Sequence, residues 1–227
     1  AYLASKGRFD IKGYSSFLSQ FNSMPTIREF RQAIHLLQYC YATRYSYLKF
    51  EKENTTIGHN DLLNLDIYTD ASNPEDSSQG GYFILLNGYL LDSKSYRISH
   101  KTRSSFEAEL IALTRGVVQA LKLIPSIKDI GYKKLQVTAY CDNEAVITRV
   151  KSQGEGDLLT QIYRNCLNYL RYEYELNNFA LNHIDGKINP ADLLTKPLDS
   201  YKLFSLLQGS ILKKTFSLQI GKPKSTK

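Results

Sequence analysis

Four acidic residues stand where strand-like or helix-like stretches begin or end. Asp70 ends the apolar stretch 65–69, which is typical of a buried strand. Asp142 ends a second stretch of this kind and opens a helix-like segment, whereas Glu109 and Asp192 lie within helix-like segments. Because strand ends and helix starts can meet at one edge of a sheet, the four carboxylates can converge there.

Such a group of carboxylates has a definite chemistry. Crowded carboxylates repel one another unless a cation lies among them. Hard divalent ions such as Mg²⁺ take oxygen ligands, and a pair of such ions is a common device for in-line attack on a phosphodiester. The acidic set therefore predicts a metal-dependent nuclease.

Each acid also has an ordinary structural interpretation. Asp70 could be a strand-end aspartate, although an uncompensated charge beside an apolar strand is costly. Asp142 could be an N-cap, and Asp192 could interact with a helix dipole. Glu107 and Glu109 diverge by about 200° on a helix, so they cannot share one site, and the apolar stripe favours Glu109 only weakly.

The composition fits a globular domain with an extension. The chain has 227 residues, 42% apolar and 22% charged, and a net charge of +7. These values support a packed core and suit a polyanionic partner, although a merely basic protein would share them. The widely spaced Cys40, Cys141 and Cys166 form no CxxC pair, which favours free thiols in a reducing compartment over a zinc site or disulfides. No run of about 18 apolar residues occurs, so neither a membrane span nor a membrane partner is expected.

Residues 1–60 are expected to form an extension before the main domain. Thr26 and Glu29 make a capping-box pattern at the start of a helix that runs to about Tyr41. Its apolar positions recur at helical spacing and are Ile27, Phe30, Ile34, Leu37 and Tyr41. A lone helix cannot bury such a stripe, so we expect it to pack on the rest of the chain. A short strand is expected over 45–50.

Residues 61–198 are expected to form an α/β domain. The expected strands are 65–69, 80–87, 89–99, 135–140 and 179–184. The expected helices run from Ser104 or Ser105 to Pro125 and over 143–150, 157–175 and 190–196. Asn87-Gly88 is a strong hairpin signal. Three meandering strands followed by strands crossed by helices imply a mixed sheet with helices on its faces.

The two ends of the chain carry less information. Residues 199–227 are basic, and we expect them to form a C-terminal tail that is disordered at its end. The chain starts at Ala1 without a signal peptide and is expected to be a piece of a longer protein.

The motifs around the four acids resemble the ribonuclease H domain of copia-class LTR retrotransposon Pol polyproteins. In chain order they are Thr69-Asp-Ala-Ser, Ser104-Ser-Phe-Glu-Ala-Glu-Leu, Cys141-Asp-Asn-Glu-Ala and Ala191-Asp-Leu-Leu-Thr-Lys-Pro-Leu. Upstream, the stretches that begin at Tyr2 and Phe17 and the helix over 33–48 resemble the segment that joins reverse transcriptase to ribonuclease H in those polyproteins. The resemblance covers about residues 1–198.

The resemblance implies a ribonuclease H-like fold, with a five-stranded mixed sheet flanked by helices and an N-terminal connection or tether. It implies hydrolysis of the RNA strand of RNA–DNA hybrids with two Mg²⁺ ions, for which Mn²⁺ could substitute. Asp70 would bridge both ions, Glu109 and Asp142 would hold one, and Asp192 would hold the other near the attacking water. The family pattern also favours Glu109 over Glu107.

Partners and location follow from the same resemblance. The implied partners are the hybrid and the reverse transcriptase part of the same polyprotein. The implied location is the cytoplasm, within a virus-like particle, with the nucleus as the alternative.

Two features depart from the family pattern. The chain contains no Trp, and residues 154–164 replace the His-rich stretch that follows the third acid. Substrate contacts of that stretch cannot be carried over. Phosphate contacts would then fall to the tail lysines and to Arg149, Lys151, Arg164 and Arg171, which could equally be solvated charges.

Three interpretations stay open. A recruited, non-catalytic module of this fold could bind nucleic acid or a protein partner without cleaving. An integrase or transposase nuclease is disfavoured, because its last ligand is usually a glutamate and here the late acid is Asp192. His183, on the last expected strand, could donate a proton to a leaving group or be an ordinary surface histidine.

Overall fold

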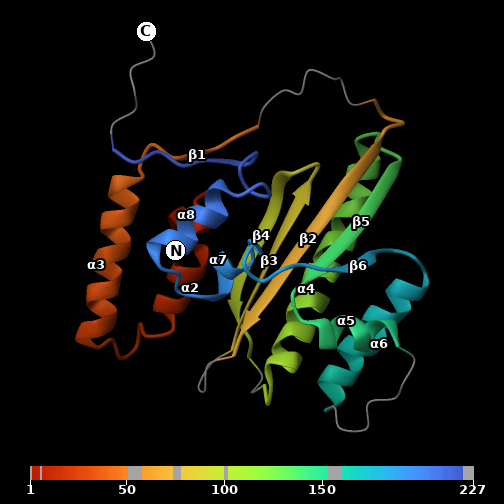
Figure 1. Cartoon of the computed structure of the whole chain (residues 1–227), viewed down its shortest axis with the longest axis horizontal. Coiled ribbons are helices and arrows are strands. Elements are labelled where there is room, and N and C mark those ends of the chain that lie inside the picture. Colours follow the sequence, from red (N-terminus) through yellow and green to blue (C-terminus); the bar gives the residue numbers. More distant parts are fainter. Residues whose placement is uncertain are drawn as a thin grey trace.

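A five-stranded mixed sheet forms the centre of the molecule (Figure 1). The computed structural model describes residues 2–5, 7–50, 58–73, 78–99, 102–152 and 160–221. The strands of the sheet are β2 (Leu62–Ser72), β3 (Gln79–Leu86), β4 (Tyr89–Arg97), β5 (Lys134–Cys141) and β6 (Ala180–His183). Their order is β4-β3-β2-β5-β6, with β2, β3 and β4 antiparallel and with β5 and β6 parallel to β2. The expected five-stranded mixed sheet flanked by helices is confirmed.

The hairpin between β3 and β4 forms where its sequence signal lies. Asn87 and Gly88 have φ values of 50° and 84°, and the two-residue loops that match the twist of a hairpin require this left-handed backbone at both positions. The register Leu86↔Tyr89 follows directly from that turn. The predicted hairpin is therefore confirmed.

Two hydrophobic cores lie on opposite faces of the sheet. Because successive side chains of a strand alternate between faces, Leu65 and Ile67 of β2 join the first core and Tyr68 joins the second. The helices α4 (Ser105–Asp129), α5 (Glu144–Lys151) and α6 (Gln161–Glu175) cover the first face (Figure 1). Residues 157–159, which were expected to open the last of these helices, lie outside the described residues.

The long helix α4 extends beyond its predicted end. Its Ser104 side chain accepts a hydrogen bond from the Glu107 N–H, as an N-cap does. The expected stop at Pro125 is wrong, because the helix continues to Asp129. Proline ordinarily disrupts a helix interior, but here Ile127 is buried in the first core and holds the last turn in place. By length and composition alone α4 could cross a membrane, yet its apolar residues are explained by their packing on the sheet.

The two ends of the chain meet over the second face of the sheet. The N-terminal segment comprises α1 (Tyr2–Ser5), η1 (Phe9–Ile11) and α2 (Lys12–Ser19), and the C-terminal segment comprises α7 (Asp192–Thr195), α8 (Ser200–Gln208) and β7 (Phe216–Ser217). Phe9 packs edge-on against Phe83 of β3 and Phe216 of β7. β7 also pairs antiparallel with β1 (Tyr47–Leu48). The stretch after residue 198, expected only as a basic tail, thus folds back over the sheet, and residues 222–227 lie outside the described residues.

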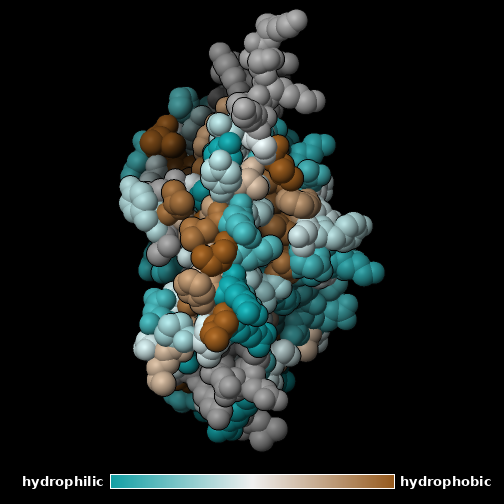
Figure 2. Space-filling model, turned by 90° about the vertical axis from the view of Figure 1, so that its left-hand side faces the viewer, coloured by the Kyte–Doolittle hydropathy of each residue, from teal (hydrophilic) through white to brown (hydrophobic). Residues whose placement is uncertain are grey.

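Helix α3 (Ile27–Ala42) begins as predicted but faces the other way. Its capping box between Thr26 and Glu29 is present. The predicted packing of its apolar stripe is wrong, because Phe30 and Leu37 are 65% and 62% exposed. The opposite side contacts the body of the protein, where the Tyr39 hydroxyl donates to the buried Asp10 carboxylate at 2.9 Å. Apolar residues are accordingly visible along the molecular face on which α3 lies (Figure 2).

Candidate active site

The four predicted acids come from four elements that meet at one edge of the sheet. Asp70 lies near the end of β2, and Asp142 directly follows the parallel neighbouring strand β5. Glu109 lies in α4, and Asp192 opens α7. Asp70 and Asp192 are each 1% exposed and Glu109 is 5% exposed, whereas Asp142 is half-buried. The parallel strand pair thus brings together acids that are far apart in the sequence.

The short helix α7 is held in place by its surroundings. A helix of one turn is unstable alone, so tertiary contacts must position Asp192. Asn189 is fully buried, and its side-chain amide donates to the Thr69 carbonyl at 3.0 Å while its oxygen accepts from the Ala191 N–H at 3.1 Å. On the other side, α2 approaches so closely at Gly13 that a Cβ there would collide with the backbone of α7. These contacts tie α7 to the strand that carries Asp70.

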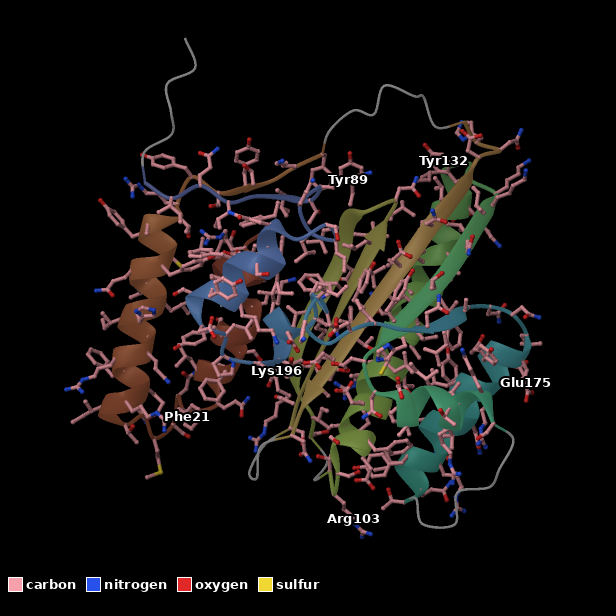
Figure 3. All side chains as sticks on the ribbon, viewed as in Figure 1. Phe21, Tyr89, Arg103, Tyr132, Glu175 and Lys196 are labelled. Atoms are coloured by element: carbon pink, nitrogen blue, oxygen red, sulfur yellow. The ribbon has the colours of Figure 1, made fainter. Side chains whose placement is uncertain are left out.

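A lysine lies between two of the acids. The Lys196 Nζ is 3.1 Å from Asp70 Oδ1 and 2.5 Å from Asp192 Oδ1. The Thr195 hydroxyl also donates to Asp70, and Lys202 forms a second ion pair with Asp192. Figure 3 shows Lys196 next to α7 and the end of β2. The sequence analysis quoted this lysine within a motif but assigned it no role, although its position four residues after Asp192 is an ion-pair spacing on a helix.

The two neighbouring glutamates of α4 have different surroundings. Glu109 Oε1 accepts from the Ala71 N–H at 3.0 Å, and its Oε2 is buried without a hydrogen-bond partner among the described residues. Glu107 instead accepts from the Arg103 N–H at 2.6 Å, at the start of the helix. The structure therefore places Glu109 with the other acids and Glu107 in a capping position.

The pKa values of three of the acids are raised, so the protein disfavours the ionisation of all of them at once. Burial raises the pKa of Asp70 to about 6, with Asp192 and Asp142 adding to the rise and Lys196 opposing it. The pKa of Glu109 is raised well above its ordinary value, first by burial and then by the charges of Asp70 and Asp142. Burial likewise raises the pKa of Asp142. A cation within the cluster would favour the ionised forms of all three.

The residues present fit a divalent metal ion. The carboxylates of Glu109 and Asp142 and the thiol of Cys141 each offer a ligand atom, and these atoms lie within 4.8 Å of one another. The unpartnered Glu109 oxygen is available to a cation, and Lys196 already supplies a positive charge between Asp70 and Asp192. Glu109 and Asp142 thus offer ligand atoms close enough to share one ion, whereas Asp70 and Asp192 share the ammonium of Lys196.

The other residues that the sequence offered for proton donation or phosphate contact are one histidine and several basic residues. His183 ends β6 opposite Cys141 and is exposed. Arg171 donates to the Arg149 carbonyl at 2.9 Å, so its guanidinium contributes to packing between α5 and α6. Arg164 and Lys151 are exposed. Residues 154–159 of the stretch that departs from the family pattern lie outside the described residues.

Relatives were found among retrotransposon polyproteins. No protein-family model matches the chain. The chain is 30% identical over 207 residues to the Transposon Ty1-JR1 Gag-Pol polyprotein of Saccharomyces cerevisiae, which corresponds to 91% of this chain and 12% of that one. A truncated Transposon Ty1-A Gag-Pol polyprotein from the same yeast is also 30% identical, over 17% of its length. A match of this length includes both the N-terminal extension and the sheet domain, and the chain spans a small part of each relative.

Solved structures with some likeness include ribonucleases H. The N-terminal RNase H domain of Rv2228c from Mycobacterium tuberculosis is 14% identical, with a TM-score of 0.46, over 64% of this chain and 97% of that one. LC11-RNase H1, solved in complex with an RNA/DNA hybrid, is 20% identical, with a TM-score of 0.43, over 57% of this chain and 92% of that one.

Proposed function

We propose that the chain is one segment of a copia-class retrotransposon Gag-Pol polyprotein and that this segment is a ribonuclease H. Its reaction would be metal-dependent hydrolysis of the RNA strand of RNA–DNA hybrids during reverse transcription. The observation that carries the proposal is the convergence of Asp70, Glu109, Asp142 and Asp192 at the edge of the sheet.

The proposed mechanism uses these acids as ligands. Two Mg²⁺ ions, or Mn²⁺ in their place, would activate the attacking water and stabilise the leaving 3′ oxygen. Asp70 would serve both positions, with Glu109 and Asp142 on one side and Asp192 on the other. The raised pKa values of Asp70 and Glu109 support this role, since buried carboxylates without enough nearby cations retain protons that a metal ion would displace.

Lys196 occupies the place of a cation in the metal-free protein. It neutralises Asp70 and Asp192 in the metal-free protein, and it would give up these contacts as cations enter. Its side chain is partly exposed, so the ammonium could then contact a phosphate of the substrate.

The proposed partners and location follow from the resemblance to copia-class polyproteins. The chain matches 12% of the Ty1-JR1 Gag-Pol polyprotein, and the partner that we propose is the reverse transcriptase part of the same polyprotein. The net charge of +7 suits a phosphate backbone. We place the protein in the cytoplasm within a virus-like particle, or in the nucleus.

The proposal is tested with a labelled RNA–DNA hybrid at low salt, with Mg²⁺ and with Mn²⁺. We expect weak cleavage of the RNA strand and intact double-stranded DNA, because few phosphate contacts give salt-sensitive binding. Asp70→Asn should abolish cleavage, whereas Asp129→Asn, at the exposed end of α4, should retain it. If wild type and Asp70→Asn bind the hybrid equally and both are inert, the chain is a non-catalytic binding module instead.

A further inference from the structure

A thiol stands among the proposed metal ligands. Cys141 is the last residue of β5, is 0% exposed, and immediately precedes Asp142. Its sulfur lies within 4.8 Å of a carboxylate oxygen of Glu109 and of Asp142. Mg²⁺ takes oxygen ligands and has no use for this sulfur, so the proposed nuclease chemistry does not account for it.

The geometry suits a softer ion. Zinc binds sulfur at about 2.3 Å and carboxylate oxygen at about 2.0–2.2 Å, so its ligand atoms lie roughly 3.5 Å apart. The three ligand atoms here lie within 4.8 Å of one another, so side-chain movements would have to bring them closer to reach this spacing. The buried Glu109 oxygen without a partner among the described residues independently indicates that a ligand is missing at this point.

We propose that Glu109, Cys141 and Asp142 bind a thiophilic divalent cation such as Zn²⁺ or Cd²⁺. On binding, the thiol releases its proton to solvent and the sulfur becomes a ligand, and a protonated Glu109 carboxyl would release its proton to solvent as well. This site shares Glu109 and Asp142 with the proposed nuclease, and in that respect the inference rests on the proposed function. Thiophilic ions would therefore compete with Mg²⁺ and inhibit the enzyme.

The direct probe is Cd²⁺ titrated into the full chain while the ultraviolet charge-transfer absorption of Cd²⁺–thiolate is recorded. A double variant, Cys40→Ala with Cys166→Ala, keeps Cys141 as its only thiol and should show the band with one equivalent of Cd²⁺. Cys141→Ser should lose that band while its circular dichroism stays native. Glu109→Gln in the double variant should weaken Cd²⁺ binding about tenfold or more, and excess Mg²⁺ should weaken it as well.

The outcomes separate this inference from the proposed function. A band that persists in Cys141→Ser, or that is absent from the double variant, overturns the thiol site whether or not the protein cleaves hybrids. A band that Mg²⁺ and Glu109→Gln leave unchanged overturns the shared site. A normal band in a protein that cleaves no hybrid leaves the site standing and removes only the proposed function.

Discussion

At the scale of single residues, the acidic site owes its metal-free stability to Lys196. Buried carboxylates are costly unless they are paired, and this ammonium contacts both Asp70 and Asp192. Burial by itself lowers the pKa of Lys196, but the charges and hydrogen bonds of Asp70 and Asp192 together outweigh it and raise the pKa. The lysine thus stands where positive charge is required and competes with the proposed cations for the same acids.

Replacing Lys196 distinguishes its stabilisation of the acids from its competition with cations. We expect Lys196→Met to lower the melting temperature of the metal-free protein, because Asp70 then keeps only the Thr195 hydroxyl and Asp192 only the ammonium of Lys202. Mg²⁺ should then stabilise the variant more than it stabilises wild type. Thermal denaturation with and without Mg²⁺ measures both, and Lys187→Met, at an exposed loop residue, is the control. Equal Mg²⁺ stabilisation of variant and wild type would show that the lysine does not compete with the ion.

Asp70 makes the metal-free protein depend on pH. Folding raises its pKa from 3.8 to about 6, so the folded state holds this proton more tightly than the unfolded chain does. The resulting stabilisation is complete below about pH 4 and is lost as the pH rises through 6. We expect the free energy of unfolding of wild type, relative to Asp70→Asn, to fall by about 2 kcal/mol between about pH 4 and pH 7.

Denaturant titrations of both proteins in chelator measure this difference. Adding Mg²⁺ at neutral pH should restore the stability of wild type but not that of Asp70→Asn, which lacks the bridging carboxylate. A difference that stays constant from acidic to neutral pH would contradict the raised pKa.

At the scale of elements, α3 and α4 use their apolar residues in opposite ways. Leu110 of α4 is fully buried against the sheet, whereas Leu37 of α3 is 62% exposed. α3 is oriented by its polar side, since Arg8 and Tyr39 both donate to the buried carboxylate of Asp10. A satisfied buried polar group thus determines which face of the helix turns inward.

The same substitution in the two helices tests this difference. Leu110→Ala should lower the free energy of unfolding by about 2–5 kcal/mol, because it leaves a cavity in the core. Leu37→Ala should change it by about 0.5 kcal/mol or less, as surface substitutions do. Both values come from denaturant unfolding under one set of conditions. A large loss of stability in Leu37→Ala would mean that the apolar stripe of α3 is covered in solution.

At the scale of the whole molecule, the segments on either side of the sheet domain complete its second core. Leu206, Leu207 and Phe216 are buried there together with Phe9. Thr215 of the C-terminal segment connects to the N-terminal extension and to β4. Its carbonyl accepts from the Lys49 N–H, and its hydroxyl accepts from the Leu90 N–H. The sheet domain therefore depends on residues that precede and follow it.

We expect a fragment of residues 61–198 to melt at least on the order of 10 °C below the full chain, because it exposes the second face of the sheet. The full chain should unfold in one transition. Phe216→Ala in the full chain isolates one contact of this core and should cost about 3–5 kcal/mol. A fragment as stable as the full chain would show that residues 61–198 fold independently. Circular dichroism during heating measures all three.

The sequence by itself determined the local features of this protein. The helix starts at Thr26 and Ser104 and the turn at Asn87 depend on side chains and backbone within a few residues, so they were predictable from caps and turn signals. The order of strands and helices followed from periodicity and set the mixed sheet.

Tertiary structure alone decided how distant residues meet. Only the fold shows that Lys196 lies between Asp70 and Asp192, that Cys141 lies beside Glu109, and that α3 turns its polar side inward. Helical spacing places residues on a face but does not say which face is buried, because the other contacting surface comes from elsewhere in the chain. The stretch after residue 198 looked like a tail for the same reason, since its apolar residues find their partners only when both ends of the chain meet over the sheet.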